Sequence, residues 1–279
     1  MKIALLQLQA GADPAANLAR GLSAARAAAA EGAEVLCFAE LAFTPFYPQV
    51  PADRQPWAEH ARALAEPIPG PTTEAFQTLA AELGVVVILN LYERDGDRAY
   101  DTSPVIDADG TLLGRTRMLH ITEYEAFHEQ GYYDPGDTGA PVYATRFGKF
   151  GVAICYDRHY PEVMRALTLG GAEVVFVPQA GAVGEWPDGL YEAEMQVAAF
   201  QNGIFVALCN RVGQEEHLEF AGESFVCAPD GRVLARAAAG RDDVLHAELD
   251  RQQVAASHAK RLFLRDRRPE LYAAWLDRR

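Results

Sequence analysis

A cysteine stands where a buried strand is expected to lead into a helix. Residues 150–154 (Phe-Gly-Val-Ala-Ile) are apolar and partly β-branched, and Pro161 stands where a first helical turn would begin. Cys155 is therefore expected at the carboxyl end of a sheet, near helix amides that favour a thiolate. A nucleophilic cysteine is usually presented in this way. The alternative is a small buried apolar residue, which is what most free cysteines are.

Two glutamates are candidates for the group that accepts a proton from this thiol. Glu40 follows the apolar residues 35–39, so its carboxylate is expected at the carboxyl end of a strand. Glu129 lies in residues 120–137, a long polar and aromatic segment without clear periodicity, and long ordered loops are commonly functional. A carboxylate whose pKa is raised by burial can act as both base and acid near neutral pH.

Histidines are the other candidates for a base or for metal ligands. Spacing alone singles out none of His120, His128 and His159. A zinc site built from Cys155, His159 and His120 lacks the paired Cys-x-x-Cys or His-x-x-x-His spacing that zinc ligands usually show. We therefore predict that the chain binds no metal.

Composition and charge narrow the classes of function. The 279 residues are 49% hydrophobic and 23% charged, which is ordinary for a globular enzyme, and no repeat or Pro/Gly/Ser-rich linker divides them. One domain spanning residues 1–279 is the expectation. A formal net charge of −14 argues against nucleic acid or an anionic membrane as partner.

The cellular compartment is also predicted from the sequence. The N-terminus lacks a basic region followed by an apolar one, and no stretch is long and apolar enough to span a bilayer. The four cysteines lie in strand-like apolar runs, which argues against a disulfide framework. A cytoplasmic location is therefore expected.

The elements that position these residues alternate between strands and helices. Strands are predicted at residues 3–8, 35–38, 85–91, 150–154, 174–177 and 204–208, and helices at residues 13–30, 71–83, 162–169 and 188–201. An Asp-Gly turn at residues 109 and 110 predicts a β-hairpin of residues 103–106 and 111–119. Short strands near residues 225–227, 233–235 and 244–249 precede a basic, helix-prone tail. This order predicts a mixed α/β sandwich.

Several separated motifs together resemble the nitrilase superfamily of carbon-nitrogen hydrolases. They are Phe-Ala-Glu-Leu at 38–41, the segment 129–137 ending in Pro-Gly-Asp, and residues 151–162 around Cys155, followed by matches at 210–213, 222–225, 229–231 and 267–269. The resemblance covers essentially the whole chain. It implies a four-layer α-β-β-α sandwich with two mixed sheets between helix layers. It also implies a homodimer or larger homo-oligomer, to which the tail at about 250–279 would contribute a contact.

The resemblance also implies roles for single residues. Cys155 resembles the nucleophile that attacks the amide or carbamoyl carbon, and Glu40 the general base. Glu129 is similar to the family's second glutamate, which orients the lysine or the substrate, and the backbone N–H of Tyr156 would supply half of an oxyanion hole. Neither a metal nor an organic cofactor is implied.

One position departs from the family pattern. The lysine expected two residues before the His-Ile pair of the hairpin strand is Met118 here, and none of Lys2, Lys149 and Lys260 can be aligned with it. Losing one oxyanion donor costs roughly 2.7 to 4 kcal/mol in a known hydrolase. Arg117 is the nearest candidate substitute, if a one-residue strand bulge points it inward. Protonated His120 or His128 is the alternative.

The substrate class depends on a second cation. Arg158 follows the nucleophile by three residues, and family members that act on N-carbamoyl amino acids look similar there, with an arginine that holds the substrate carboxylate. N-carbamoyl-β-alanine is therefore the expected type of substrate. The alternative is a structural ion pair between Arg158 and a neighbour such as Glu162. The side chains expected to line the pocket, unless core packing accounts for them, are Tyr124, Tyr132, Trp186 and Asn210.

Two classes of function remain open. The first is a cysteine amidohydrolase that cleaves a carbamoyl or simple amide bond of a small molecule, with an aliphatic amide or a nitrile as the next candidate substrate. The second is a binding or regulatory module that kept the fold and lost turnover with its lysine. The pair Arg117 and Met118 separates the two.

Overall fold

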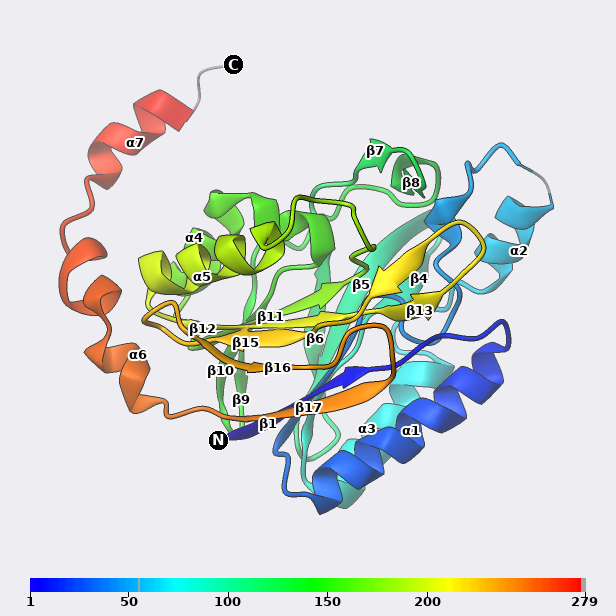
Figure 1. The fold of residues 1–279 in the computed structure, drawn as a ribbon, viewed down its shortest axis with the longest axis horizontal. Coiled ribbons are helices and arrows are strands. Elements are labelled where there is room, and N and C mark those ends of the chain that lie inside the picture. The colour runs from blue at the N-terminus through cyan, green and yellow to red at the C-terminus, as the bar shows by residue number, and fades with distance from the viewer. Residues whose placement is uncertain (55, 277–279) are drawn as a thin grey trace.

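The computed structural model describes residues 1–54 and 56–276 (Figure 1). Within them, seven strands form a first mixed sheet, in which β17, β1, β2, β3 and β5 are neighbours in that order and both β4 and β6 also pair with β5. β1, β2 and β3 run parallel and the other neighbours are antiparallel. The strands are β1 (Lys2–Gln7), β2 (Val35–Phe38), β3 (Val86–Ile88), β4 (Leu91–Asp95), β5 (Arg98–Ile106), β6 (Leu112–Arg117) and β17 (Asp243–Glu248).

A second mixed sheet has six strands in the order β16-β15-β12-β11-β10-β9. Its three central strands, β10, β11 and β12, are parallel, as in the first sheet. The strands are β9 (Val142–Thr145), β10 (Gly148–Val152), β11 (Val174–Gln179), β12 (Phe205–Asn210), β15 (Phe225–Cys227) and β16 (Val233–Arg236).

Helices cover the outer face of each sheet. α1 (Pro14–Ala30) and α3 (Pro71–Leu83) pack on the first sheet, and α4 (Pro161–Leu169) and α5 (Leu190–Asn202) pack on the second (Figure 1). The largest apolar cluster lies between the sheets, where side chains such as Leu5 and Ile88 pack with Phe176 and Phe205. The four-layer α-β-β-α sandwich predicted from the sequence is therefore confirmed.

The remaining elements connect the layers or lie at their edges. They are η1 (Tyr47–Gln49), α2 (Trp57–Ala63), β7 (Glu123–Tyr124), β8 (Phe127–His128), η2 (Glu129–Gly131), η3 (Cys155–His159), β13 (Val212–Gln214), β14 (Glu219–Ala221), α6 (Gln252–Ala256), η4 (Ala259–Phe263) and α7 (Pro269–Leu276). No helix of residues 1–54 and 56–276 has the length and apolar character needed to cross a membrane.

Local signals explain the helix boundaries. The Asp13 carboxylate accepts the backbone N–H of Ala15 at 3.0 Å and Pro14 occupies the first turn of α1, as a capped helix start requires. α3 ends at Gly84, whose φ of +69° is the left-handed conformation that glycine adopts most easily. Both helices therefore have the bounds that the sequence predicted.

One predicted strand is interrupted. Residues 85–91 read as a single buried strand, whereas the structure assigns residues 86–88 to β3 and begins β4 at Leu91. Both pieces pair antiparallel with β5 in one register, since Ile88 lies opposite Val105 and Leu91 lies opposite Thr102, so they share one edge of that strand. The other edge of β5 pairs with β6. The unbroken apolar run gave no sign of the short break between the two pieces.

The C-terminal tail leaves the sandwich. α6 and η4 run along the edge near α5, and α7 extends away from the four layers (Figure 1). Leu271, Trp275 and Leu276 of α7 are all exposed. The predicted role of this tail in a dimer stays a prediction.

Candidate active site

Three side chains predicted to act together meet between the two sheets. Glu40 lies just past β2, Glu129 begins η2, and Cys155 begins η3, a short step past the end of β10. One ligand-type atom from each of the three lies within 4.8 Å of the others, and all three residues are buried. The carboxyl ends of β2 and β10 thus bring together an acid–thiol cluster of Glu40, Glu129 and Cys155 from distant parts of the chain.

Both strand ends at this cluster have a strained backbone. Leu41 has a φ of +46° and Cys155 a φ of +41°, a left-handed region that non-glycine residues adopt at a cost of about 1 to 3 kcal/mol. Side chains hold each turn: Asn90 Oδ1 accepts the Leu41 N–H at 2.7 Å, and Arg158 Nη1 donates to the Cys155 carbonyl at 2.9 Å. The sharp turns present Glu40 and the thiol to each other.

The thiol of Cys155 is neutral in its surroundings. Burial, followed by the nearby charges of Glu40 and Glu129, raises its pKa well above the ordinary value, and Arg158 only partly opposes this. Gln179 Nε2 lies 3.3 Å from the sulfur and its Oε1 accepts from Arg158 Nη1 at 2.7 Å. This differs from the thiolate predicted from the strand-to-helix position, because η3 is a short turn and two acids face the sulfur. A base is therefore needed to ionise it.

Glu40 has the properties of such a base. Its carboxyl is fully buried, and neither oxygen has a hydrogen-bond partner among the described residues. Burial and the charge of Glu129 raise its pKa to about 8. The pKa of Glu129 is also well above its ordinary range, through burial and the nearby Asp101, although a backbone N–H from Thr122 reaches its Oε2 at 3.4 Å.

The donor set of the acid–thiol cluster is poorly suited to a metal. Glu40, Glu129 and Cys155 form the one group of acid, thiol or imidazole side chains close enough to share an ion in the part of the chain that the structure describes. Metal ligands have to be deprotonated, whereas all three groups have raised pKa values that favour their neutral forms.

The predicted histidine alternatives lie elsewhere. Within the described residues, Cys155, His159 and His120 do not come together as a ligand set. His120 Nδ1 pairs with Asp157 at 2.6 Å, and His159 Nδ1 pairs with Glu194 at 2.7 Å. His128 Nδ1 pairs with Glu123 at 2.6 Å and is not at the thiol.

Arg117 does not replace the expected lysine. Its Nε and Nη2 bind the Glu93 carboxylate at 2.9 and 2.7 Å, and its other contacts are Asp95 at 2.6 Å and Asp137 at 2.9 Å. Every guanidinium nitrogen is thus engaged in a separate charge cluster. The pairing of β5 with β6 has one register shift, between Val105 and Ile106, but Arg117 pairs regularly with Thr102 and its side chain points to Glu93.

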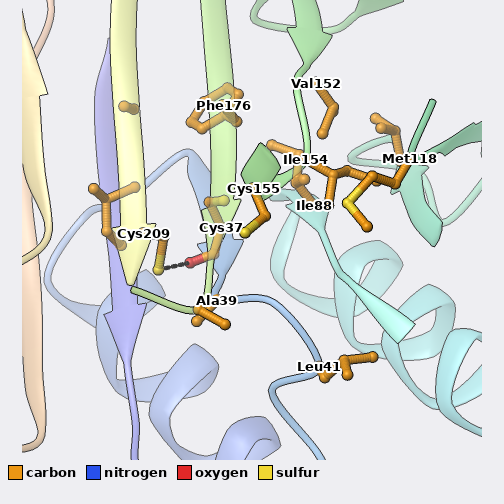
Figure 2. Packing of buried hydrophobic residues seen from close by; sticks show 14 of the residues in the cluster. Cys37, Ala39, Leu41, Ile88, Met118, Val152, Ile154, Cys155, Phe176 and Cys209 are labelled. Carbon is orange, nitrogen blue, oxygen red and sulfur yellow. Dashed lines mark hydrogen bonds between the residues drawn. The ribbon is translucent and has the colours of Figure 1, made fainter. Parts of the chain in front are cut away.

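Met118 occupies the space beside the nucleophile. It is 1% exposed and packs in the same buried cluster as Ile88, Ile154 and Cys155 (Figure 2). Its backbone N–H donates to the Asp101 carbonyl at 2.9 Å. An apolar thioether therefore stands at the position where the family resemblance led us to expect a cation.

Residues predicted to bind substrate line two neighbouring cavities. Arg158 and Trp186 line a cavity of about 270 Å³. Trp186 also lines a second cavity of about 400 Å³, together with Asn210. The side-chain amide of Asn210 binds the backbone of Gly181 and Gly222, so it holds together the segments that follow β11 and β14.

The other predicted pocket residues have local partners. Tyr124 donates its hydroxyl to Glu185 Oε1 at 2.5 Å, and Tyr132 donates to the Val50 carbonyl at 2.7 Å. The alternative ion pair of Arg158 is present, but its partner is Glu194, with Nε to Oε2 at 3.3 Å. Helical spacing suggested Glu162, whereas Arg158 lies in η3, outside α4.

The sequence analysis missed two buried polar side chains at the cluster. Gln179 ends β11 beside Asn210 at the end of β12, so the carboxyl end of a strand was the available signal. Asp101 lies in β5, is fully buried and faces Glu40. Its position in the sequence gave no signal. Successive side chains of a strand point to opposite faces, and the pattern of polar residues in this strand did not show which of them point toward Glu40.

The chain is similar to known proteins over most of its length. A carbon-nitrogen hydrolase family model matches residues 2–259. An N-carbamoylputrescine amidase of Solanum lycopersicum is 36% identical, covering 98% of this chain and 94% of the relative. A beta-ureidopropionase of Arabidopsis thaliana is 35% identical over 80% of this chain and 58% of its own length. The crystal structure of a carbon-nitrogen hydrolase from Helicobacter pylori G27 superimposes with a TM-score of 0.86, at 27% identity and over 100% and 99% of the two chains.

Proposed function

The chain belongs to the carbon-nitrogen hydrolase family and is a cysteine-dependent hydrolase of carbon-nitrogen bonds, and we propose that its substrate is an N-carbamoyl amino acid such as N-carbamoyl-β-alanine. Cys155 is the proposed nucleophile, Glu40 the general base and acid, and Glu129 the second acid that orients the substrate. This assignment is supported by the acid–thiol cluster, in which one atom of each side chain lies within 4.8 Å of the others, and by the raised pKa of Glu40.

The first half of the reaction forms a covalent intermediate. Glu40 takes the proton of the Cys155 thiol as the sulfur attacks the carbamoyl carbon and a C–S bond forms. The backbone N–H of Tyr156 would stabilise the developing oxyanion. The C–N bond to the amino acid then breaks, and Glu40 returns the proton to the leaving amine. The products at this stage are the free amino acid and an S-carbamoyl cysteine.

The second half restores the enzyme. Glu40, again ionised, takes a proton from a water molecule that attacks the S-carbamoyl carbon. The C–S bond breaks, the sulfur regains its proton from Glu40, and carbamic acid leaves. Carbamic acid decomposes to ammonia and carbon dioxide, so ammonia release reports turnover.

The observation that supports the substrate proposal most directly is a buried N–H group of Arg158 that is unpaired within the described part of the chain. Its Nη1 is fixed by the Cys155 carbonyl and by Gln179, whereas its buried Nη2 has no hydrogen-bond partner among the described residues. An unpaired guanidinium donor costs free energy when it is buried. A substrate carboxylate beside Tyr156 would satisfy it, which agrees with the relative named beta-ureidopropionase.

A second candidate substrate is N-carbamoylputrescine. Glu194 lines the same cavity as Arg158, at 24% side-chain exposure, and would attract the ammonium group of such a substrate. The relative named N-carbamoylputrescine amidase supports this alternative.

The two candidates differ in the charge that the cavity recognises. We would compare kcat/KM for N-carbamoyl-β-alanine and N-carbamoylputrescine, with an aliphatic amide and a nitrile in the same panel. The proposal expects the wild type to prefer the acid, and Arg158→Gln to lower kcat/KM for the acid by about 10- to 100-fold more than for the amine. The matched variant is Glu194→Gln, which should spare the acid. A wild type that prefers the amine and loses that preference in Glu194→Gln would assign the second candidate.

A further inference from the structure

A second buried carboxyl lies against Glu40. Asp101 of β5 is fully buried, and its carboxyl is within hydrogen-bonding reach of the Glu40 carboxyl. Three oxygens of the two groups, Glu40 Oε1, Glu40 Oε2 and Asp101 Oδ2, have no hydrogen-bond donor among the described residues. Two ionised carboxylates cannot bond to each other, so a hydrogen bond between these groups requires a proton on one of them.

A chain of hydrogen bonds determines which Asp101 oxygen faces Glu40. The backbone N–H of Leu41, directly after Glu40, donates to Asn90 Oδ1 at 2.7 Å. This fixes the orientation of the Asn90 amide, whose Nδ2 donates to Asp101 Oδ1 at 2.5 Å. Asp101 Oδ2 is the oxygen left over, and it is the one without a partner in the described residues. The proton of the pair therefore belongs on the Oδ2 side.

Electrostatics favour one shared proton. Like charges in contact inside a protein cannot both ionise, as in other carboxyl pairs. Burial and the charge of Glu40 raise the pKa of Asp101 well above its ordinary value, whereas Asp101 acts to lower the pKa of Glu40. Glu40 therefore ionises first and Asp101 keeps the proton.

The surroundings supply little compensating positive charge. The titratable and charged groups that face the pair come from several packed elements: Glu129 from η2, Cys155 and Asp157 from η3, Arg211 after β12, Tyr47 from η1, and Tyr133. Of these, Arg211 is the cation, and its Nη1 binds the backbone carbonyls of Glu40 and Leu41. At the position of the expected lysine, Met118 provides no charge and no donor.

We propose that Asp101 is a positioning residue that carries a proton on Oδ2 and donates it to the Glu40 carboxylate, taking over the task of a cation in this site. The hydrogen bond stabilises Glu40 in the ionised form that accepts the proton of Cys155. The proposal rests on the proposed role of Glu40 as base.

The pH dependence of kcat/KM for ammonia release tests this role. Asp101→Asn keeps an N–H donor toward Glu40, because Asn90 still orients the new amide, so the acidic limb should stay where it is in the wild type. Asp101→Ala removes the donor, so the limb should move to higher pH by about one unit, with roughly tenfold lower kcat/KM below it. Ser103→Ala is the matched control. Ser103 lies on the same strand as Asp101, and its hydroxyl oxygen also accepts from Asn90 Nδ2, at 3.2 Å, but it does not contact Glu40.

Two outcomes would overturn the proposal. A limb that moves to lower pH in Asp101→Asn would mean that Asp101 is ionised and repels the Glu40 charge. Limbs that stay unchanged in all three variants would mean a structural role alone.

A second readout does not depend on turnover. The infrared difference spectrum of wild type minus Asp101→Asn at pH 7 should contain the C=O band of a protonated carboxyl group. If the band is present while no substrate is hydrolysed, the proposed function fails and the proton on Asp101 stands. If hydrolysis occurs and the band is absent, the proposed function stands and the proposal of a proton on Asp101 fails.

Discussion

Two buried carboxylate clusters share strands β5 and β6 and differ in their compensation. On one side, Glu93 receives Arg117 Nε and Nη2, Arg115 Nη1 at 3.0 Å and the hydroxyl of Thr102 at 2.7 Å. On the other side, the carboxyl groups of Glu40, Asp101 and Glu129 lie at close range and all have raised pKa values. The residue paired with Asp101 there is the apolar Met118. Adjacent residues of a strand point to opposite faces, so one step along the chain separates an arginine from a methionine.

This difference separates structure from chemistry. Glu93 is held by two guanidinium groups and a hydroxyl, so its charge is satisfied and its contribution is to stability. Glu40 is equally buried, but the groups within its reach are the Asp101 carboxyl and the Cys155 thiol and no guanidinium of the described residues pairs with it, so its proton affinity is high. A fold can thus place the same residue type in a stabilising or a reactive setting through its partners alone.

The largest expected effect concerns the sulfur in the uncompensated cluster. Cys155→Ala should lower ammonia release by more than about 10⁴-fold, because it removes the atom that forms the covalent bond. Cys227→Ala is the matched control, since Cys227 is also buried but lies in β15, outside the cluster. Turnover that survives Cys155→Ala would exclude the proposed mechanism.

Breaking the compensated cluster should cost stability. Glu93→Gln leaves the buried guanidinium of Arg117 without its main carboxylate, and removing one partner of a buried ion pair typically costs about 3 to 5 kcal/mol. Urea unfolding at pH 7 measures the loss. A variant as stable as the wild type would show that Asp95 and Asp137 suffice for Arg117.

The opposite substitution in the uncompensated cluster should increase stability at neutral and higher pH. The folded-state pKa of Glu40, about 8, lies above that of an unfolded chain, so its favourable contribution is complete at acidic pH and is lost as pH rises through 8. Glu40→Gln removes this loss, which amounts to about 1.4 kcal/mol per pH unit at most. Urea unfolding between pH 5 and 8 should therefore show that the free energy of unfolding falls less steeply with pH in the variant than in the wild type. The variant should also have lost its hydrolytic activity. Parallel declines would contradict the high pKa.

A smaller effect should follow from restoring the cation. Met118→Lys places an ammonium on the residue that pairs with Asp101, which faces Glu40, and an opposite charge favours the ionised carboxylate. The acidic limb of kcat/KM should move below pH 8 by about one unit. The comparison variant Met118→Leu, similar in volume and uncharged, should leave the limb in place. If turnover appears only in Met118→Lys, the natural chain is the non-catalytic module that the sequence left open.

The sequence predicted the parts of the molecule that depend on local patterns. Helix caps, the hairpin turn and the two glutamates and cysteine at strand ends are all local, and the structure brings the three side chains together. Arg117 was misjudged because its partners come from β4 and from the segment before β9, which no spacing rule connects. Asp101 was missed because its importance depends on its contact with Glu40, which lies 61 positions earlier in the chain.

The pH dependence of ammonia release from N-carbamoyl-β-alanine by the wild type tests the central claim most directly, with Cys155→Ala as the blank. The uncompensated acid–thiol cluster predicts turnover whose kcat/KM rises with pH through about 8, as Glu40 ionises. Turnover that is flat between pH 5 and 9, or a folded protein that hydrolyses no compound of the panel at any pH, would contradict it.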